Sequence, residues 1–166
     1  MKQDLYEKIV TYITENQNNF YRLAYSYVQN QEGALDVVQN TACKVLEHYE
    51  SLRNEDAIRT WVYKIVVNEI LRFLKEKNKI RLLEENEQME LSYEEKAFDI
   101  QEDLYTQINH LDVDEQNIIK LRFYEGLSLK EIAEITEVNL NTVKAKLYRG
   151  LRKLKAVIRP DDIETY

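Results

Sequence analysis

The sequence predicts an all-helical (all-α) protein of two small domains, the second a helix-turn-helix. Three observations predict this fold class. The chain of 166 residues has only three Gly and one Pro, whereas a sandwich or barrel needs many turns with positive φ. Apolar residues recur at spacings of three and four, as on one side of an amphipathic helix. An acidic stretch, residues 78–107, separates two blocks of such helices.

The composition is that of a folded protein without export or membrane signals. Hydrophobic residues make up 44% of the chain and charged residues 32%, too much apolar material for a disordered chain. Cys43 stands alone and no Cys/His group has zinc spacing, which favours a reducing, cytoplasmic setting and predicts no metal or cofactor. The N-terminus is charged, and no apolar run approaches the roughly 20 residues that span a bilayer. We therefore expect no direct membrane insertion.

Residues 1–77 are expected to form the first domain. Four helices are predicted there, over residues 3–14, 18–28, 31–50 and 56–77, with a polar loop before the last one. The third helix has an apolar stripe at helical spacing. Its members are Ala34, Val37, Val38, Ala42, Val45, Leu46 and Tyr49.

Residues 78–107 form the acidic stretch, with three basic and nine acidic residues. We interpret it as an exposed tether. If fully flexible, about 30 residues have a root-mean-square span of about 30 Å, enough for two domains to engage separate sites. The alternative is a solvated helix that joins one continuous body.

Residues 108–166 are expected to form the second domain. A helix over residues 111–123 is ended by Gly126, a residue type suited to the left-handed stop of a helix. Ser128 and Glu131 have the spacing of a capping box, so a short helix is predicted over residues 129–136. After a three-residue turn, a longer helix is expected from Leu140 to about Ile158.

The last helix has two different faces. An apolar stripe is formed by Val143, Leu147, Leu151 and Leu154. Between Lys144 and Arg159 there are seven basic residues and no acidic one, in a protein whose net charge is -7. Two short helices, a tight turn and a basic second helix are the outline of a DNA-binding helix-turn-helix. The opposite face consists of Asn141, Ala145, Tyr148, Arg149 and Arg152, flanked by Thr142, Lys146 and Lys153.

The basic face suits direct contact with duplex DNA. Ala145 is small enough to let the helix approach the base edges, Asn141 can pair with an adenine edge, and Arg149 can donate two hydrogen bonds to a guanine. The alternative is a basic amphipathic helix whose charges only keep its outer face soluble. Phosphate contacts, which set the register without reading sequence, are expected of Lys144, Lys146, Arg152 and Lys153.

At these motifs the chain resembles a known family. Residues 111–116, 124–133 and 141–150 are similar to the fourth conserved region of extracytoplasmic-function (ECF) sigma factors of the sigma-70 family. Residues 27–40 resemble the core-binding helix of region two in that family, and residues 60–68 resemble its promoter-melting segment. The two blocks stand in the family's order and cover most of the chain.

The resemblance implies a transcription initiation factor with core RNA polymerase and promoter DNA as partners. The first domain would bind the polymerase and open the minus 10 element, and the second would recognise the minus 35 element. Asp36, Gln39 and Asn40 would contact the polymerase. The alternative for Asp36 is an ordinary surface acid. The family further implies control by an anti-sigma factor, commonly membrane-anchored, in responses such as stress.

The resemblance also implies a site for single-stranded DNA. The loop over residues 50–58 would hold a base flipped out of the minus 10 strand, which requires stacking and hydrogen-bonding partners. Trp61 has a structural alternative, because it lies four residues from Ile65 and both can belong to the core. The expected minus 10 contacts are Arg53, Asn54, Trp61, Tyr63, Asn68 and Arg72.

The sequence also bears on two other classes of function. A stand-alone helix-turn-helix regulator would bind its operator without polymerase, and it would not need the N-terminal block. An enzyme is disfavoured, because the sequence offers no phosphate-cradling glycine loop, no metal cluster and no nucleophile with a plausible base.

Overall fold

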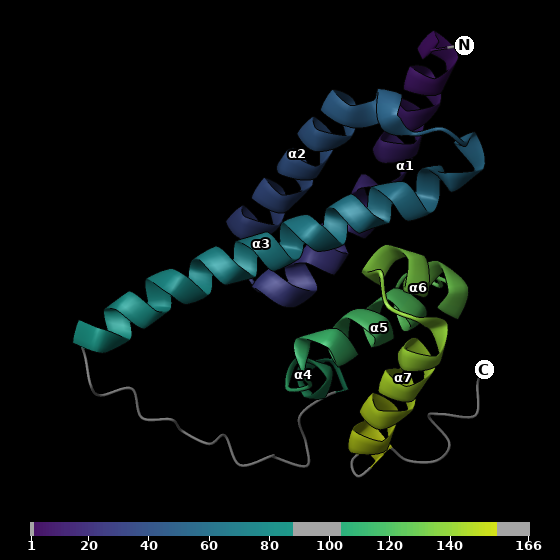
Figure 1. Cartoon of the computed structure of the whole chain (residues 1–166). Helices are drawn as coiled ribbons and strands as arrows, with labels where there is room; N and C mark the ends of the chain where they lie inside the picture. Colours follow the sequence, from purple (N-terminus) through teal and green to yellow (C-terminus); the bar gives the residue numbers. More distant parts are fainter. Residues whose placement is uncertain (1, 88–103, 156–166) are drawn as a thin grey trace.

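The computed structural model describes residues 2–87 and 104–155, and every regular element in these two ranges is a helix (Figure 1). This confirms the predicted fold class. The N-terminal half contains α1 (Lys2–Val28), α2 (Gln31–His48), the short 3-10 helices η1 (Tyr49–Ser51) and η2 (Glu55–Ala57), and α3 (Ile58–Glu87). The C-terminal half contains α4 (Leu104–Asn109), α5 (Val113–Phe123), α6 (Leu129–Thr136) and α7 (Leu140–Lys155).

The corner between α1 and α2 depends on two local features. Asn30 caps α2, because its side-chain oxygen accepts a hydrogen bond of 2.6 Å from the Gly33 backbone N–H. At Gly33 an added Cβ would lie 2.5 Å from Val28 and 2.7 Å from Phe73, so only glycine lets these helices approach so closely. The buried Glu69 of α3 forms an ion pair with Lys44 of α2, so this contact joins α2 to α3.

Helices α1 and α3 are longer than the sequence predicts. Residues 3–14 and 18–28 belong to one continuous helix, α1. Asn16, in the expected break, donates a side-chain hydrogen bond of 2.8 Å to the Tyr12 carbonyl and so remains compatible with a helix. Helix α3 passes the expected end at Lys77 and continues to Glu87, because no Gly or Pro interrupts it.

The predicted tether, residues 78–107, is therefore partly helical. Its first ten residues belong to α3, and its last four belong to α4. Residues 88–103 lie outside the described residues. The division into two domains with boundaries at 77 and 108 stays a prediction.

The C-terminal half follows the predicted pattern closely. The capping box of α6 is present, with the Ser128 hydroxyl accepting from Glu131 N–H at 3.0 Å and the Glu131 carboxylate accepting from Ser128 N–H at 3.1 Å. Gly126 has a φ of +67°, as a left-handed stop requires. The apolar stripe of α7 faces inward, with Val143, Leu147 and Leu154 buried.

Helix α5 is surrounded by protein on all sides. All seven residues from Glu115 to Leu121 are buried, whereas a surface helix buries only one stripe. Besides α6 and α7, this helix contacts the N-terminal half, and α6 packs along α3 (Figure 1). The two halves thus share a contact that the tether interpretation did not include. Within the described ranges, no helix is both long and apolar enough to cross a membrane.

Candidate nucleic-acid interface

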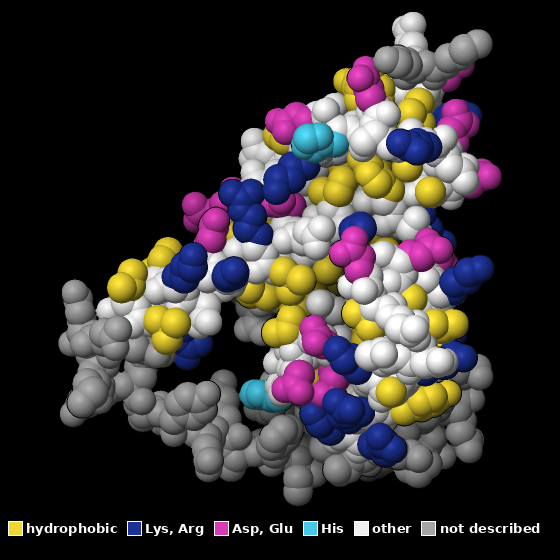
Figure 2. Space-filling view, viewed as in Figure 1, with side chains coloured by type: hydrophobic (Ala, Val, Ile, Leu, Met, Phe, Trp, Pro, Cys, Tyr) yellow, Lys and Arg dark blue, Asp and Glu magenta, His cyan; other side chains and the backbone are white. Residues whose placement is uncertain are grey.

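Helix α7 presents its polar face to solvent. Figure 2 shows several Lys and Arg side chains in the lower part of the view, where α7 lies, with Asp and Glu side chains beside them. The small Ala145 is exposed in the middle of the face, and Tyr148 is 59% exposed beside it. Of the predicted minus 35 residues, only Lys146 is partly buried. The exposed ones are Asn141, Thr142, Lys144, Ala145, Tyr148, Arg149, Arg152 and Lys153.

The start of α7 is capped by Asn139, two residues before the predicted base-reading residue Asn141. The Asn139 side chain accepts a hydrogen bond of 2.8 Å from the Asn141 backbone N–H, which satisfies one of the amide donors that the first turn of a helix leaves free. The Asn141 side chain remains exposed and can contact a base edge.

Two basic residues of the face are held by carboxylates of the α5 N-terminal region. Lys146 lies 2.9 Å from Asp114, and Lys153 lies 2.6 Å from Glu115 and 3.7 Å from Asp112. The hydrogen bond to Glu115 raises the pKa of Lys153 above its ordinary value, and the nearby charges of Glu115 and Asp112 add to this rise. The phosphate contacts predicted for Lys146 and Lys153 would therefore compete with these ion pairs.

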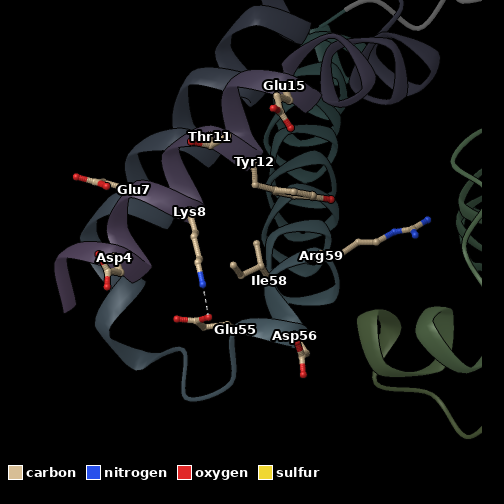
Figure 3. A pocket seen from close by; sticks show the side chains of 10 residues that line it. All are labelled: Asp4, Glu7, Lys8, Thr11, Tyr12, Glu15, Glu55, Asp56, Ile58 and Arg59. Atoms are coloured by element: carbon tan, nitrogen blue, oxygen red, sulfur yellow. Dashed lines mark hydrogen bonds and ion pairs between the residues drawn. The ribbon is translucent and has the colours of Figure 1, made fainter. Parts of the chain in front are cut away.

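The loop before α3 borders an open hollow of about 810 Å³. Figure 3 shows this hollow between the N-terminal part of α1 and the start of α3, with Lys8 and Glu55 joined across its mouth at 2.6 Å. Asn54 caps η2 by accepting from the Asp56 N–H, and Arg53 is exposed. Five of the ten lining residues are acidic and two are basic, so the hollow disfavours phosphate groups. The acidic ones are Asp4, Glu7, Glu15, Glu55 and Asp56.

The predicted minus 10 residues of α3 differ in exposure. Trp61 is partly buried against the core, as expected if it is a core residue. Tyr63 is only 3% exposed, and its hydroxyl donates to the Glu125 carboxylate at 2.7 Å. Asn68 is exposed beside a narrow crevice between the halves, and Arg72 is exposed with Glu76 at 3.5 Å. As folded, Tyr63 faces the C-terminal half and not solvent.

Glu125 lies in the turn between α5 and α6, where it meets α1 and α3. Burial raises the pKa of its carboxyl group, and the hydrogen bond from Tyr63 and the positive charges of Arg22 and Arg59 oppose that rise. Arg59 also donates to the Glu125 carbonyl oxygen at 3.4 Å. The turn is thereby attached to the face of α3 that carries Tyr63.

The predicted polymerase-binding residues share an exposed face of α2. Asp36, Gln39 and Asn40 are all exposed, and Leu35 next to them is 51% exposed. The opposite stripe of this helix is buried, with Ala34, Val37 and Val45 among the core residues. An exposed face that mixes apolar and polar side chains on a well-anchored helix is suited to binding a protein partner.

Comparison with known proteins agrees with this geometry. Residues 12–80 match the family model of sigma-70 region 2, and residues 101–154 match that of sigma-70 region 4. The RNA polymerase sigma factor SigV of Bacillus subtilis (strain 168) is 41% identical over 162 residues, covering 98% of each chain. The ECF RNA polymerase sigma-E factor of Haemophilus influenzae is 29% identical over 163 residues, covering 89% of this chain and 86% of the relative. The chain belongs to the ECF sigma factors.

Solved structures share the fold of this sigma factor. CnrH in complex with the cytosolic domain of CnrY aligns with a TM-score of 0.67 at 17% identity, covering 89% of this chain and 85% of CnrH. RpoE of Bartonella quintana in complex with the anti-sigma factor NepR aligns with a TM-score of 0.69 at 21% identity, covering 96% and 97% of the two chains. Sigma factors are transcription initiation factors and not enzymes.

Sequence reasoning missed the residues that join the two halves of the sigma factor. None of them carries a local signal, because each is a charged residue in a helix or turn, where a solvated position is the ordinary interpretation. Their partners are more than sixty residues away in sequence. The missed residues are Arg59, Lys64, Lys120, Glu125 and Glu137.

Proposed function

We propose that this ECF sigma factor contacts core RNA polymerase through α2, the minus 10 element through α3 and the loop before it, and the minus 35 element through α7. In this assignment Asp36, Gln39 and Asn40 face the polymerase. The assignment of individual residues rests on the family pattern and on their exposure.

The observation that carries the proposal is the division of α7 into two faces. Its apolar stripe is part of the core, whereas its polar face is exposed and bears a small residue at its centre. A helix in the major groove needs close approach at the centre and hydrogen-bond donors around it. Asn141 and Arg149 are the proposed base-reading residues, and the lysines around them would position the helix on phosphates.

The minus 10 role requires an exposed α3. Arg53, Asn54, Asn68 and Arg72 are exposed and could meet a single strand. Trp61 and Tyr63 would stack on bases only after the contacts around them change. We propose that the polymerase-bound form provides this change.

We further propose control by an anti-sigma factor. The relatives CnrH and RpoE are described in complex with CnrY and NepR, the first of these represented by its cytosolic domain. A membrane-anchored inhibitor with a cytosolic domain would hold this sigma factor in the cytoplasm near the membrane. Co-purification from a membrane fraction, lost when the inhibitor's membrane span is deleted, would support this arrangement.

Run-off transcription with bacterial core polymerase tests the main proposal. Core enzyme alone, core with the sigma factor, and the sigma factor alone are compared on a promoter library. We expect promoter-specific transcripts only from the combined reaction. A transcript pattern that is the same with and without the chain, from a core preparation that responds to another sigma factor, would refute the proposal.

A footprinting experiment separates the proposal from a stand-alone regulator. A helix-turn-helix regulator protects its operator by itself at moderate salt. The sigma factor should protect promoter DNA only together with core polymerase. Clear protection by the free chain at one operator sequence would favour the regulator instead.

A further inference from the structure

One side of α7 lies against α5. Lys146, Gly150 and Lys153 are four and three residues apart, so they share this side of the helix. Gly150 is buried, and a Cβ added there would lie 2.7 Å from the Ile119 Cδ1 atom and 3.4 Å from the Glu115 carboxylate. Any side chain at this position would displace Ile119, which is itself buried. The two helices are therefore in close contact at Gly150.

A buried carboxylate of α5 holds this side of α7. Glu115 is only 2% exposed, and its Oε1 atom accepts a hydrogen bond of 2.6 Å from the Lys153 ammonium. Its Oε2 atom is also buried and has no hydrogen-bond partner among the described residues. A buried carboxylate is stable only when a partner balances its charge. Lys153 is that partner.

The neighbouring pair of Lys146 and Asp114 differs in burial. The Asp114 side chain is 70% exposed, so water can solvate its carboxylate when Lys146 turns toward a phosphate. Glu115 has no such access to water, and a buried carboxylate that loses its cation keeps the full cost of desolvation. Lys153 should therefore stay on Glu115 when α7 meets DNA.

The anchored side of α7 adjoins the proposed base-reading face. Arg149 lies four residues before Lys153, so the two side chains leave the helix next to each other. A rotation of α7 about its axis would move the Arg149 guanidinium relative to the guanine edge that it is proposed to read. Two hydrogen bonds to one base tolerate little displacement, because a hydrogen bond weakens steeply as its angle departs from linear.

We propose that Glu115 and Lys153 are positioning residues of the minus 35 site, which fix the rotation of α7 on α5 and thereby align Arg149 with its base. This inference rests on the proposed minus 35 role of α7, and it removes Lys153 from the set of phosphate contacts. The specificity of the site then depends on a buried residue of α5 as well as on the exposed face of α7.

Transcription by the holoenzyme from a library randomised in the minus 35 element tests the proposal. The ratio of transcript yields from preferred and mismatched sequences measures discrimination. Lys153→Met leaves the Glu115 carboxylate buried without its cation, so α7 should reorient. The ratio should then fall by about threefold to tenfold, part of the discrimination that one bidentate contact supplies. Lys153→Met combined with Glu115→Gln has no unpaired buried charge and should regain part of the ratio.

Lys144→Met is the matched control for loss of a lysine charge. Lys144 is an exposed residue of α7 and a proposed phosphate contact. Its loss should weaken all sequences alike and reduce the salt slope of duplex binding by about 0.9 in magnitude, whereas Lys153→Met should leave that slope unchanged. A merely structural defect would lower the yield from every promoter in the same proportion, and a second substitution at Glu115 would not reverse it.

Circular dichroism of each variant shows whether the helices remain. If Lys153→Met does not fold, Glu115→Gln alone replaces it. This variant keeps the volume of the side chain but frees the Lys153 ammonium, so the ratio should fall while the salt slope becomes steeper by about 0.9.

Two results would overturn the positioning role. One is a loss in Lys153→Met that is uniform over all sequences and is not relieved by Glu115→Gln, and the other is a ratio equal to that of the wild type. Failure of the proposed function gives a different result, because the wild type would then show no preference among minus 35 sequences. In that case the positioning role fails with it.

Discussion

At the residue scale, Lys120 shows how a charge can be buried for a structural reason. Lysine is almost never fully buried unless it is paired, and here no carboxylate lies against its ammonium among the contacts described. Two side-chain amides, one backbone carbonyl and a tyrosine ring take that place. Such partners satisfy the ammonium donors but do not neutralise the charge, so the pKa falls.

Closure of the two halves should consequently depend on pH. With the halves apart, Lys120 is hydrated and has an ordinary pKa near 10.4, whereas in the closed form its pKa is about 7. Between these values the open form binds more protons, so raising the pH from 7 toward 10 favours closure by up to about tenfold per unit. Below pH 7 both forms are protonated and the dependence disappears. Fluorescent labels can be placed on Cys43 of α2 and on Lys130→Cys of α6, both exposed positions. Energy transfer between these labels, measured from pH 6 to 9, should therefore rise above neutral pH.

Lys120→Met tests the origin of this pH dependence. Methionine keeps an apolar chain of similar length against Tyr27 but has no proton to lose, so transfer should become flat across the range. Tyr27 faces Lys120, and burial raises the pKa of Tyr27 well above its ordinary value, so Tyr27 stays neutral throughout. Lys75 lines the recess beside Tyr27 and Gln116. The control for loss of a lysine charge is Lys144→Met, at the exposed face of α7. An unchanged pH profile in Lys120→Met would contradict the assignment.

Arg149→Ala tests base reading at the same scale. A bidentate contact to guanine contributes about 1 to 3 kcal/mol of discrimination, so the variant should lose preference at one position of the minus 35 element. Lys144→Ala, at a proposed phosphate contact, should weaken binding to all sequences alike. The measurement is transcription by the holoenzyme from a library randomised in the minus 35 element. An unchanged sequence preference in Arg149→Ala would exclude Arg149 from the base-reading set.

At the element scale, α6 depends on its cap more than the longer helices do. It has eight residues, a length at which an isolated helix is unstable in water. Its first turn is closed by the capping box, and its buried Ile132 and Ile135 attach it to the core. Since the same helix contacts α3, its stability also affects the packing of the two halves.

Ser128→Ala should lower the free energy of unfolding of the C-terminal half by about 1 kcal/mol, because the Glu131 amide loses its acceptor. Urea unfolding followed by circular dichroism measures the change. Glu134→Ala, on the exposed side of the same helix, should change stability by less than about 0.5 kcal/mol. If the two variants were equally stable, the capping box would be structurally unimportant.

At the scale of the whole molecule, the charge distribution leaves few unpaired cations for sequence-independent binding to DNA. The net charge is -7, and two cations of the α7 face are held by carboxylates of the same half. In the described part of the chain, three basic residues of that face have no ion pair, namely Lys144, Arg149 and Arg152. The free protein therefore has little electrostatic affinity for DNA.

Duplex binding by the free chain should show a shallow salt dependence. Each neutralised phosphate contributes about 0.9 to the slope of log affinity against log salt concentration, so three free cations predict a slope of about -3. Titration of a labelled duplex at several salt concentrations measures it. A slope near -4.5, the value for five cations, would mean that the ion pairs of Lys146 and Lys153 open on binding.

The sequence by itself determined the all-helical class, the capping box at Ser128, the stop at Gly126 and the two faces of α7. These features depend on residues within a few positions of one another, so caps and periodicity are sufficient to predict them. The tertiary structure decided that Lys120 is buried and that Tyr63 meets Glu125. Such outcomes depend on contacts between residues far apart in the chain, and no local pattern specifies which charged side chain will be covered. The exposed face of α7 could thus be predicted from the sequence, whereas the occupied face of α3 could not.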